Sequence, residues 1–258
     1  MKYKQFIKQL NAYDKAIKTV GTAKVIKGAV EFLKNMYKID DFEKLKDNNN
    51  NNNNVIAFKD GYLYDTKAKE YRQIKPSDYI SKTMNIKAPL HVNEEKLQNI
   101  INIIDSIFEK SKLTECWLKL FGIRLFTNKA ESIYMLTGKG GNGKGLLMNL
   151  IKDCLGSYYQ QAETTFLTNS IRAGSANPTL AKCKGIRFLS VSEPESSEQD
   201  ISLNTEFIKA LTGRDTITTR DLYKTNISYE PMFNCFLQCN NIPSIKNRGW
   251  HDTSFKND

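Results

Sequence analysis

The pattern of hydrophobic and polar residues divides the chain into segments with different expected structures. Residues 1–47 carry many lysines and place apolar side chains at helical spacing, which predicts two or three short helices. Residues 55–65 alternate apolar and polar side chains around a Lys-Asp-Gly turn, which predicts a β-hairpin. The asparagine run at 48–54 has no apolar side chain to bury, so we expect a flexible loop there.

Two helices are expected between this hairpin and the middle of the chain. Residues 91–110 place six apolar side chains on one helical face: Leu97, Ile100, Ile101, Ile104, Ile107 and Phe108. Residues 113–125 are too densely apolar for a surface helix, and we expect this segment to lie under a sheet.

A strand, a glycine loop and a helix follow one another in residues 132–147. Apolar β-formers at 133–136 lead into four glycines, and helical periodicity begins at Lys144. The loop satisfies G-x-x-x-x-G-K, in which backbone N–H groups surround phosphate oxygens and the lysine adds a positive charge. The alternative is a glycine-rich turn without a ligand. The pattern favours a nucleotide site formed by Gly138, Lys139, Gly140, Gly141, Asn142, Gly143, Lys144 and Gly145.

Magnesium binding has to depend on residues outside this loop. Gly145 stands where a Ser or Thr normally offers a hydroxyl to Mg²⁺. Residues 186–191 are short, apolar and β-prone, as in a buried parallel strand, and the acids Glu193 and Glu195 follow. The carboxyl ends of parallel strands face the ligand crevice. We therefore expect Glu193 to hold Mg²⁺ or polarise the attacking water, with Glu195 as second candidate and a surface turn as the alternative.

Further β segments follow the acidic residues. Two of them, at 217–220 and 227–231, flank Leu222, Tyr223 and Lys224, which predicts a hairpin with a basic, aromatic tip. Residues 233–239 form another buried strand pattern that ends at Asn240 and Asn241. A helix is expected at 203–211.

Two segments show no strand pattern. Residues 158–177 indicate a short helix and a polar loop, and the residues after Pro243 are polar and almost without periodicity. The whole order of elements is typical of an α/β fold, with a parallel sheet and helices on both of its faces.

The composition limits the class of protein. The 258 residues include 40% hydrophobic residues but no apolar run near 18 residues, and the start lacks a signal peptide's apolar centre. We therefore expect a soluble, intracellular protein that does not enter a membrane. Five cysteines form no C-x-x-C pair and are expected to be buried thiols. The net charge of +10 fits a polyanionic partner, although solubility alone is the alternative.

Several of these motifs together resemble a superfamily 3 helicase, as in the helicase part of viral and phage or plasmid primase-helicases. The resemblance covers residues 55–243. GKGGNGKG resembles the first nucleotide motif, RFLSVSEPE the acidic second motif, and IKALTGRDTITTRDLYK the segment before a DNA-contacting hairpin. FLQCNNIP resembles a strand that ends in a sensor asparagine three residues before proline, which selects Asn240. AFKDGYLYDTKAKEYRQIKPSDYI resembles the accessory domain that precedes such helicases.

The resemblance implies an AAA+ type P-loop ATPase that uses ATP and Mg²⁺ and forms a hexameric ring on single-stranded DNA during viral or plasmid-type replication. Asn240 would sense the γ-phosphate. DNA phosphates would meet Lys209, Arg220 and Lys224, while Tyr223 either packs on the hairpin, the favoured interpretation, or stacks on a base. If the source is viral, the expected location is the host cytoplasm or a replication factory.

The same resemblance divides the chain into an accessory domain at 1–112, mostly helical with a β-hairpin, and an ATPase domain at 113–258. Family members continue with a helix and a strand bearing an arginine that reaches the neighbouring subunit, whereas here only Arg248 follows the sensor strand. We therefore expect a domain incomplete at its C-terminal end, in a homo-hexamer or in a ring with a chain that supplies the arginine.

Two other functions compete with an ATP-dependent helicase. The first is a catalytically degenerate paralogue that binds nucleotide and DNA without unwinding, because Gly145 and the missing arginine both depart from the family pattern. The second is a small-molecule P-loop kinase, which is disfavoured because a basic hairpin and no arginine-rich lid follows the loop.

Overall fold

The computed structural model describes the following residues: 11–12, 15–16, 18–36, 42–48, 54–108, 112–126, 131–168, 176–192, 202–213, 215–223 and 225–246. Contacts between residues divide the chain into two compact units, Met1–Phe42 and Glu43–Asp258. This division has no boundary at residue 112, and the predicted assignment of domains at that point stays a prediction. Most of the predicted loop at 48–54 lies outside the described residues.

The first unit is helical where it is described, as its residue spacing predicted. Its main element is α2 (Ala23–Met36), and the backbone N–H of Ile26 donates to the carbonyl of Thr22 at its start, 3.1 Å away. The apolar side chains of α2 are exposed: Val25, Ile26, Val30, Phe32 and Leu33. A short helix, α3 (Phe42–Leu45), begins at the last residue of this unit, and its other residues belong to the second unit.

The second unit is built around a parallel sheet, which confirms the predicted α/β class. Its four strands are β4 (Ile133–Thr137), β5 (Tyr159–Glu163), β6 (Phe188–Ser192) and β10 (Asn234–Cys239). They lie in the order β4-β10-β6-β5, and every neighbouring pair is parallel. All four carboxyl ends therefore meet at one edge of the sheet.

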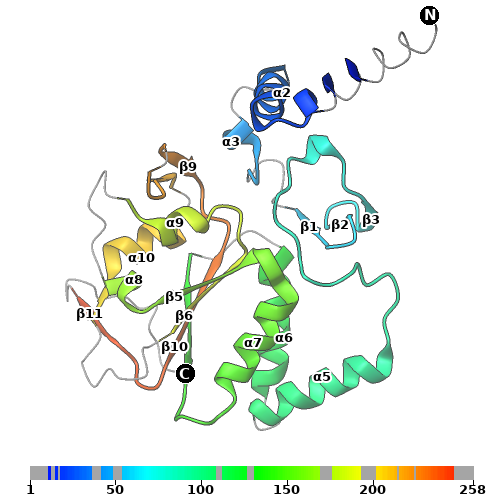
Figure 1. Cartoon of the computed structure of the whole chain (residues 1–258). Coiled ribbons are helices and arrows are strands. Elements are labelled where there is room, and N and C mark those ends of the chain that lie inside the picture. Colours follow the sequence, from blue (N-terminus) through cyan, green and yellow to red (C-terminus); the bar gives the residue numbers. More distant parts are fainter. Residues whose placement is uncertain are drawn as a thin grey trace, which may run out of the picture. The chain divides into compact units, whose positions relative to one another are not determined.

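Helices cover both faces of this sheet (Figure 1). One face packs against α7 (Lys144–Leu155) and α6 (Lys112–Phe126). We call this packing the α7-side core, and its members include Phe188, Phe236, Trp117, Leu147, Met148 and Ile151. The rings of Phe188 and Phe236 stack there with centroids 4.2 Å apart.

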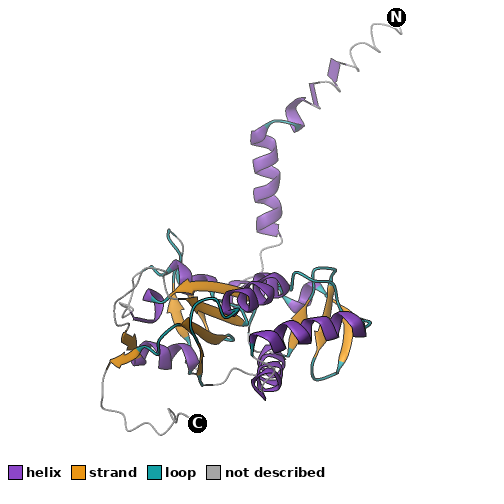
Figure 2. Cartoon of the chain, turned by 90° about the horizontal axis from the view of Figure 1, so that it is seen from below, coloured by secondary structure: helices purple, strands orange, loops and turns teal. Residues whose placement is uncertain are grey.

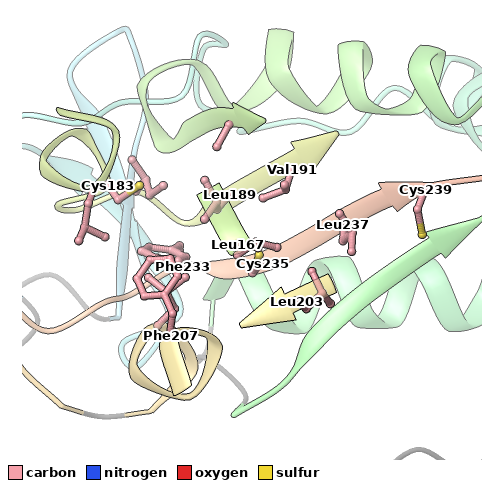
Figure 3. Packing of buried hydrophobic residues seen from close by; sticks show 14 of the residues in the cluster. Leu167, Cys183, Leu189, Val191, Leu203, Phe207, Phe233, Cys235, Leu237 and Cys239 are labelled. Atoms are coloured by element: carbon pink, nitrogen blue, oxygen red, sulfur yellow. The ribbon is translucent and has the colours of Figure 1, made fainter. Parts of the chain in front are cut away.

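The opposite face packs against α8 (Thr165–Thr168), α9 (Pro178–Lys182) and α10 (Thr205–Thr212). Its buried residues form the α10-side core, which includes Leu189, Val191, Cys235, Leu237, Leu167, Phe207 and Leu211. Figure 3 shows the side chains of Leu189, Val191 and Leu237 directed to this side of the strands. Successive strand residues thus alternate between the two cores, as strand geometry requires.

A separate antiparallel sheet contains β1 (Val55–Ala57), β2 (Tyr62–Asp65) and β3 (Glu70–Gln73). It is visible beside the parallel sheet in Figure 2. The predicted hairpin is confirmed, and β3 was missed. The backbone N–H of Ala57 donates to Tyr158 Oη at 3.2 Å, and Arg187 Nη2 donates to the carbonyl of Val55 at 3.3 Å. These buried contacts join the small sheet to the parallel one.

The two predicted helices between the sheets are confirmed. Helix α5 (Glu94–Ile107) begins at Asn93, whose side chain accepts a hydrogen bond from the backbone N–H of Lys96, 2.9 Å away. Trp117 of α6 is buried against Phe236, so α6 does lie under the sheet. Leu113 and Leu118 remain exposed, however, because α6 covers the sheet with one side only.

Three sequence predictions fail in the second unit. The segment 158–177 contains strand β5 in addition to η2 (Gly156–Tyr158) and α8, and β5 was missed because the sheet's edge tolerates its polar sequence YQQAE. Strand β11 (Ser244–Lys246) follows Pro243 and pairs in parallel with β7 (Ser202–Asn204). Leu203 accordingly belongs to β7, and helix α10 begins at Thr205.

The cysteines only partly follow their prediction. Cys183, Cys235 and Cys239 are buried, and burial raises the pKa of the Cys183 thiol to about 12. Cys154 is half-buried, and Cys116 is exposed because it lies on the outer side of α6. In the described part of the chain, no helix combines the length and the apolar character that crossing a membrane requires.

Candidate nucleotide site

The glycine loop has the strand and helix on either side that its sequence predicted. Strand β4 ends at Thr137 and α7 begins at Lys144. Gly138, Gly141 and Gly143 have φ angles of 151°, 80° and 84°, a range that favours glycine. The loop conformation therefore depends on glycine at these three positions.

Close contacts add a second reason for two of these glycines. A Cβ atom on Gly138 would lie 2.1 Å from Asn142 Nδ2, so the side chain of Asn142 fills the space above Gly138. A Cβ atom on Gly143 would lie 2.8 Å from Ile107 Cγ1, at the end of α5. The loop is thus packed tightly against its own asparagine and against α5.

Lys144, the first residue of α7, and Asn240, which follows β10, lie close together. Lys144 Nζ donates to the carbonyl of Gly138 and to that of Lys139, the latter 3.3 Å away, and it lies 3.5 Å from Asn240 Oδ1. The ammonium group is therefore held over the loop, where a phosphate would sit, and the end of β10 is within its reach.

A row of polar side chains crosses the carboxyl edge of the sheet on the α7 side. In the register of the strands, Gln238 of β10 lies opposite Ser192 of β6, which lies opposite Glu163 of β5. Gln238 Nε2 donates to Ser190 Oγ at 2.9 Å. Sequence reasoning missed these residues, because only the strand order shows that they share an edge with the loop.

Hydrogen bonds join the end of β6 to Thr164, the residue that follows the neighbouring strand β5. The backbone N–H and the hydroxyl of Thr164 both donate to the carbonyl of Ser192, at 3.1 and 2.8 Å. Thr164 is itself buried.

Farther from the edge, burial raises the pKa of Tyr159, and a hydrogen bond with Ser190 opposes this shift. The predicted Glu193 and Glu195, which follow Ser192 in the chain, lie outside the described residues.

The predicted DNA-binding residues lie away from the loop, on other elements. Lys209 is on α10, while Arg220 and Tyr223 follow β8 (Ile217–Thr219), which pairs with β9 (Ile227–Tyr229). Lys209 and Arg220 are exposed, and Lys224 lies outside the described residues. The favoured packing of Tyr223 on the hairpin is wrong, because the residue is fully exposed. Its backbone is in the left-handed region, with a φ of 57°.

The described residues near the loop do not form a cluster of His, Cys, Asp or Glu side chains that would bind a metal ion. Among the described residues, no group of three or more His, Cys, Asp or Glu side chains could hold a metal ion. Ser192, Gln238 and Glu163 are among the residues that bring side-chain oxygen atoms to this sheet edge. Such hard oxygen donors suit Mg²⁺, which keeps several of its water molecules when it binds a nucleotide.

Comparisons with known proteins identify one family model and several viral relatives. The model of a family of unknown function, DUF5906, matches residues 136–253, which include the glycine loop, β6 and β10. A protein of Acanthamoeba polyphaga mimivirus that carries the name "putative helicase" is 40% identical over 195 residues, 74% of this chain and 20% of that protein. A relative with the same name from Invertebrate iridescent virus 3 is 28% identical over 85% of this chain and 23% of its own length.

The chain spans about a fifth of the length of these two relatives. Among solved structures, the apo C-terminal region of NrS-1 (residues 305–718) has a TM-score of 0.46 at 17% identity, over 58% of this chain and 36% of that one. A second structure of this region, its A form, has a TM-score of 0.44 at 15% identity, over 57% of this chain and 34% of that one.

Proposed function

We propose that this chain is the ATP-binding part of a viral DNA helicase of superfamily 3, an AAA+ type P-loop ATPase that acts in DNA replication. The observation that carries the proposal is the meeting of Lys144, in the glycine loop, with Asn240, at the end of the neighbouring strand. A lysine that binds phosphates and a polar group that senses the γ-phosphate have to lie this close together. The names of the viral relatives support a helicase-like role.

ATP would bind through the loop's backbone N–H groups and through Lys144. The ammonium group of Lys144 would exchange the carbonyls of Gly138 and Lys139 for oxygens of the β- and γ-phosphates. Asn240 would then contact the γ-phosphate through its side-chain amide. Glu193, one residue beyond β6, would polarise the attacking water, with Glu195 as the second candidate.

Mg²⁺ fits this edge of the sheet through hard oxygen donors. Gly145 offers no hydroxyl, so Glu193 and the polar row of Ser192, Gln238 and Glu163 are the groups that would hold the ion. When bound, the ion supplies positive charge to the β- and γ-phosphates.

Single-stranded DNA would bind through exposed cations and one exposed ring. Lys209, Arg220 and Lys224 would contact phosphates, and Tyr223 is exposed enough to stack on a base. We further propose that copies of the chain form a hexameric ring, or a ring with another chain that supplies an arginine to each site. The net charge of +10 is consistent with a polyanionic partner.

The test is ATP hydrolysis by the purified chain with and without single-stranded DNA, combined with binding of a fluorescent ATP analogue. Lys144→Ala should abolish binding and keep the circular dichroism spectrum. Lys152→Ala, an exposed position further along α7, should change neither. Unchanged affinity in Lys144→Ala would contradict the proposal. Nucleotide and DNA binding without hydrolysis would instead identify a catalytically degenerate protein.

A further inference from the structure

Position 145 has room for a hydroxyl-bearing side chain, although glycine occupies it. Gly145 is the second residue of α7, its φ is not in the left-handed region, and a Cβ atom there would meet nothing within 4 Å. A Ser would fit at this position. Packing therefore does not force glycine at this position, and a Mg²⁺ ion bound here would have to take its hydroxyl ligand from another residue.

Strand β6 presents hydroxyl groups on the α7 side of the sheet. Phe188 belongs to the α7-side core, while Leu189 and Val191 belong to the α10-side core. Alternation along the strand places Ser190 and Ser192 on the same side as Phe188. The hydrogen bond from Gln238 to Ser190, 2.9 Å long, agrees with this placement.

The two serines differ in what they can reach. Ser190 is fully buried and bonded to Gln238, whereas Ser192 is the last residue of β6 and is only half-buried. Ser192 therefore places its hydroxyl at the carboxyl edge, on the side where α7 and the glycine loop begin.

The position of Ser192 is also fixed. Its carbonyl accepts two hydrogen bonds from Thr164, and it lies in register with Gln238, two residues before Asn240. Asn240 in turn lies 3.5 Å from Lys144 Nζ. A single strand, β10, thus separates Ser192 from the strand that leads into the loop.

We propose that the Ser192 hydroxyl is a ligand of the nucleotide-bound Mg²⁺, replacing the hydroxyl that Gly145 lacks. This inference rests on the proposed function, because it requires a nucleotide on the loop. It assigns the hydroxyl to the end of β6. Magnesium binding then depends on a serine that the usual loop pattern does not contain.

The test measures how the affinity for a fluorescent, non-hydrolysable ATP analogue depends on Mg²⁺ concentration. Ser192→Ala should raise the half-saturating Mg²⁺ concentration by roughly tenfold or more, and leave binding without Mg²⁺ unchanged. Adding Gly145→Ser to Ser192→Ala should restore most of the Mg²⁺ dependence. Ser190→Ala is the matched control on the same face, and it should change the Mg²⁺ requirement much less than Ser192→Ala, because Ser190 can affect the ion only through Gln238.

Replacement by thiol provides a second readout that does not depend on catalysis. Ser192→Cys should bind the analogue weakly with Mg²⁺ and recover with Cd²⁺, because a thiolate prefers a softer ion. The unmodified chain with Cd²⁺ controls for the five native cysteines. This variant decides the question if Ser192→Ala fails to fold.

The outcomes separate the inference from the function on which it rests. An unchanged Mg²⁺ requirement in Ser192→Ala, with normal analogue binding, would overturn the role of Ser192 and leave the nucleotide site intact. No recovery of Ser192→Cys with Cd²⁺ would also overturn it. No analogue binding by the unmodified chain would overturn the proposed function itself, and this inference with it.

Discussion

Lys144 Nζ lies 3.5 Å from Asn240 Oδ1, although 96 positions separate the two residues in the chain. The parallel pairing of β4 and β10 produces this proximity. Cys239 lies opposite Thr137, so the residues that follow each strand leave the sheet side by side. A phosphate held by Lys144 would therefore lie within reach of Asn240.

Asn240→Ala should keep ATP binding within a few-fold and reduce hydrolysis by about 10²–10³, the usual effect of removing one donor to a transition state. The reason is that Lys144 and the loop bind the phosphates, whereas Asn240 contacts the γ-phosphate. Hydrolysis rates and analogue binding measure the two effects separately. Asn241→Ala, at an exposed neighbour, is the control, and a larger effect there would transfer the sensor role to Asn241.

Gly143→Ala should destabilise the protein by about 1–3 kcal/mol and weaken ATP binding, because a Cβ at φ 84° is strained. The new Cβ would also contact Ile107 at 2.8 Å, so adding Ile107→Ala should relieve the clash but not the backbone strain. Gly145→Ala is the control in open space. Urea denaturation measures the stability, and equal stability of Gly143→Ala and Gly145→Ala would contradict the left-handed conformation at Gly143.

The glycine loop and the strand ends could be predicted because local chemistry defines them. Positive φ angles at Gly138, Gly141 and Gly143 require glycine, and an apolar run followed by polar residues marks the end of a buried strand. Asn240 was selected by the resemblance of FLQCNNIP to a strand that ends in a sensor asparagine, and the parallel pairing of β4 and β10 explains why it lies near Lys144. The loop and the strand ends are each defined by a short segment, so their residue patterns can be read from a single sequence.

The remaining features depend on contacts between distant segments. β5 was missed because an edge strand needs few apolar residues, and β11 because it exists only by pairing with β7. Ser192 was not singled out because its face of the strand is known only once Leu189 and Val191 are seen in the opposite core. The wrong prediction for Tyr223 has the same origin, since its exposure depends on which segments lie next to the hairpin tip, and the sequence does not display this.

Tyr223→Ala should weaken binding of single-stranded DNA by about 1–3 kcal/mol, the range measured for loss of one base-stacking ring. The side chain is fully exposed, so the melting temperature should hardly change. Tyr223→Phe keeps the ring and should bind DNA like the unmodified chain. Fluorescence anisotropy of labelled oligonucleotides measures the affinity, and equal affinity for all three proteins would exclude stacking by Tyr223.

Tyr158→Phe should destabilise the second unit by roughly 1–3 kcal/mol, because the buried N–H of Ala57 loses its acceptor. The hydroxyl of Tyr158 is one of the contacts that join β1 to the parallel sheet, so the loss should concentrate there. Hydrogen exchange should accelerate in Val55–Ala57 more than in β10. Uniform acceleration across the unit would show that β1 and the parallel sheet open together.

Glu193→Gln should leave ATP binding nearly unchanged and reduce hydrolysis by about 10²–10⁴, the usual contribution of a general base. Ser192 ends β6 opposite Gln238, and only strand β10 lies between β6 and β4, the strand that leads into the loop. Glu193 is the next residue in the chain, so it carries the first negative charge beyond this edge. Glutamine keeps the shape of the side chain and removes its charge. The variant therefore tests activation of the attacking water separately from phosphate binding. Glu195→Gln, measured in the same assay, is the matched comparison: a larger loss there would reverse the order of the two acids, and a small loss in both would place the base outside this segment.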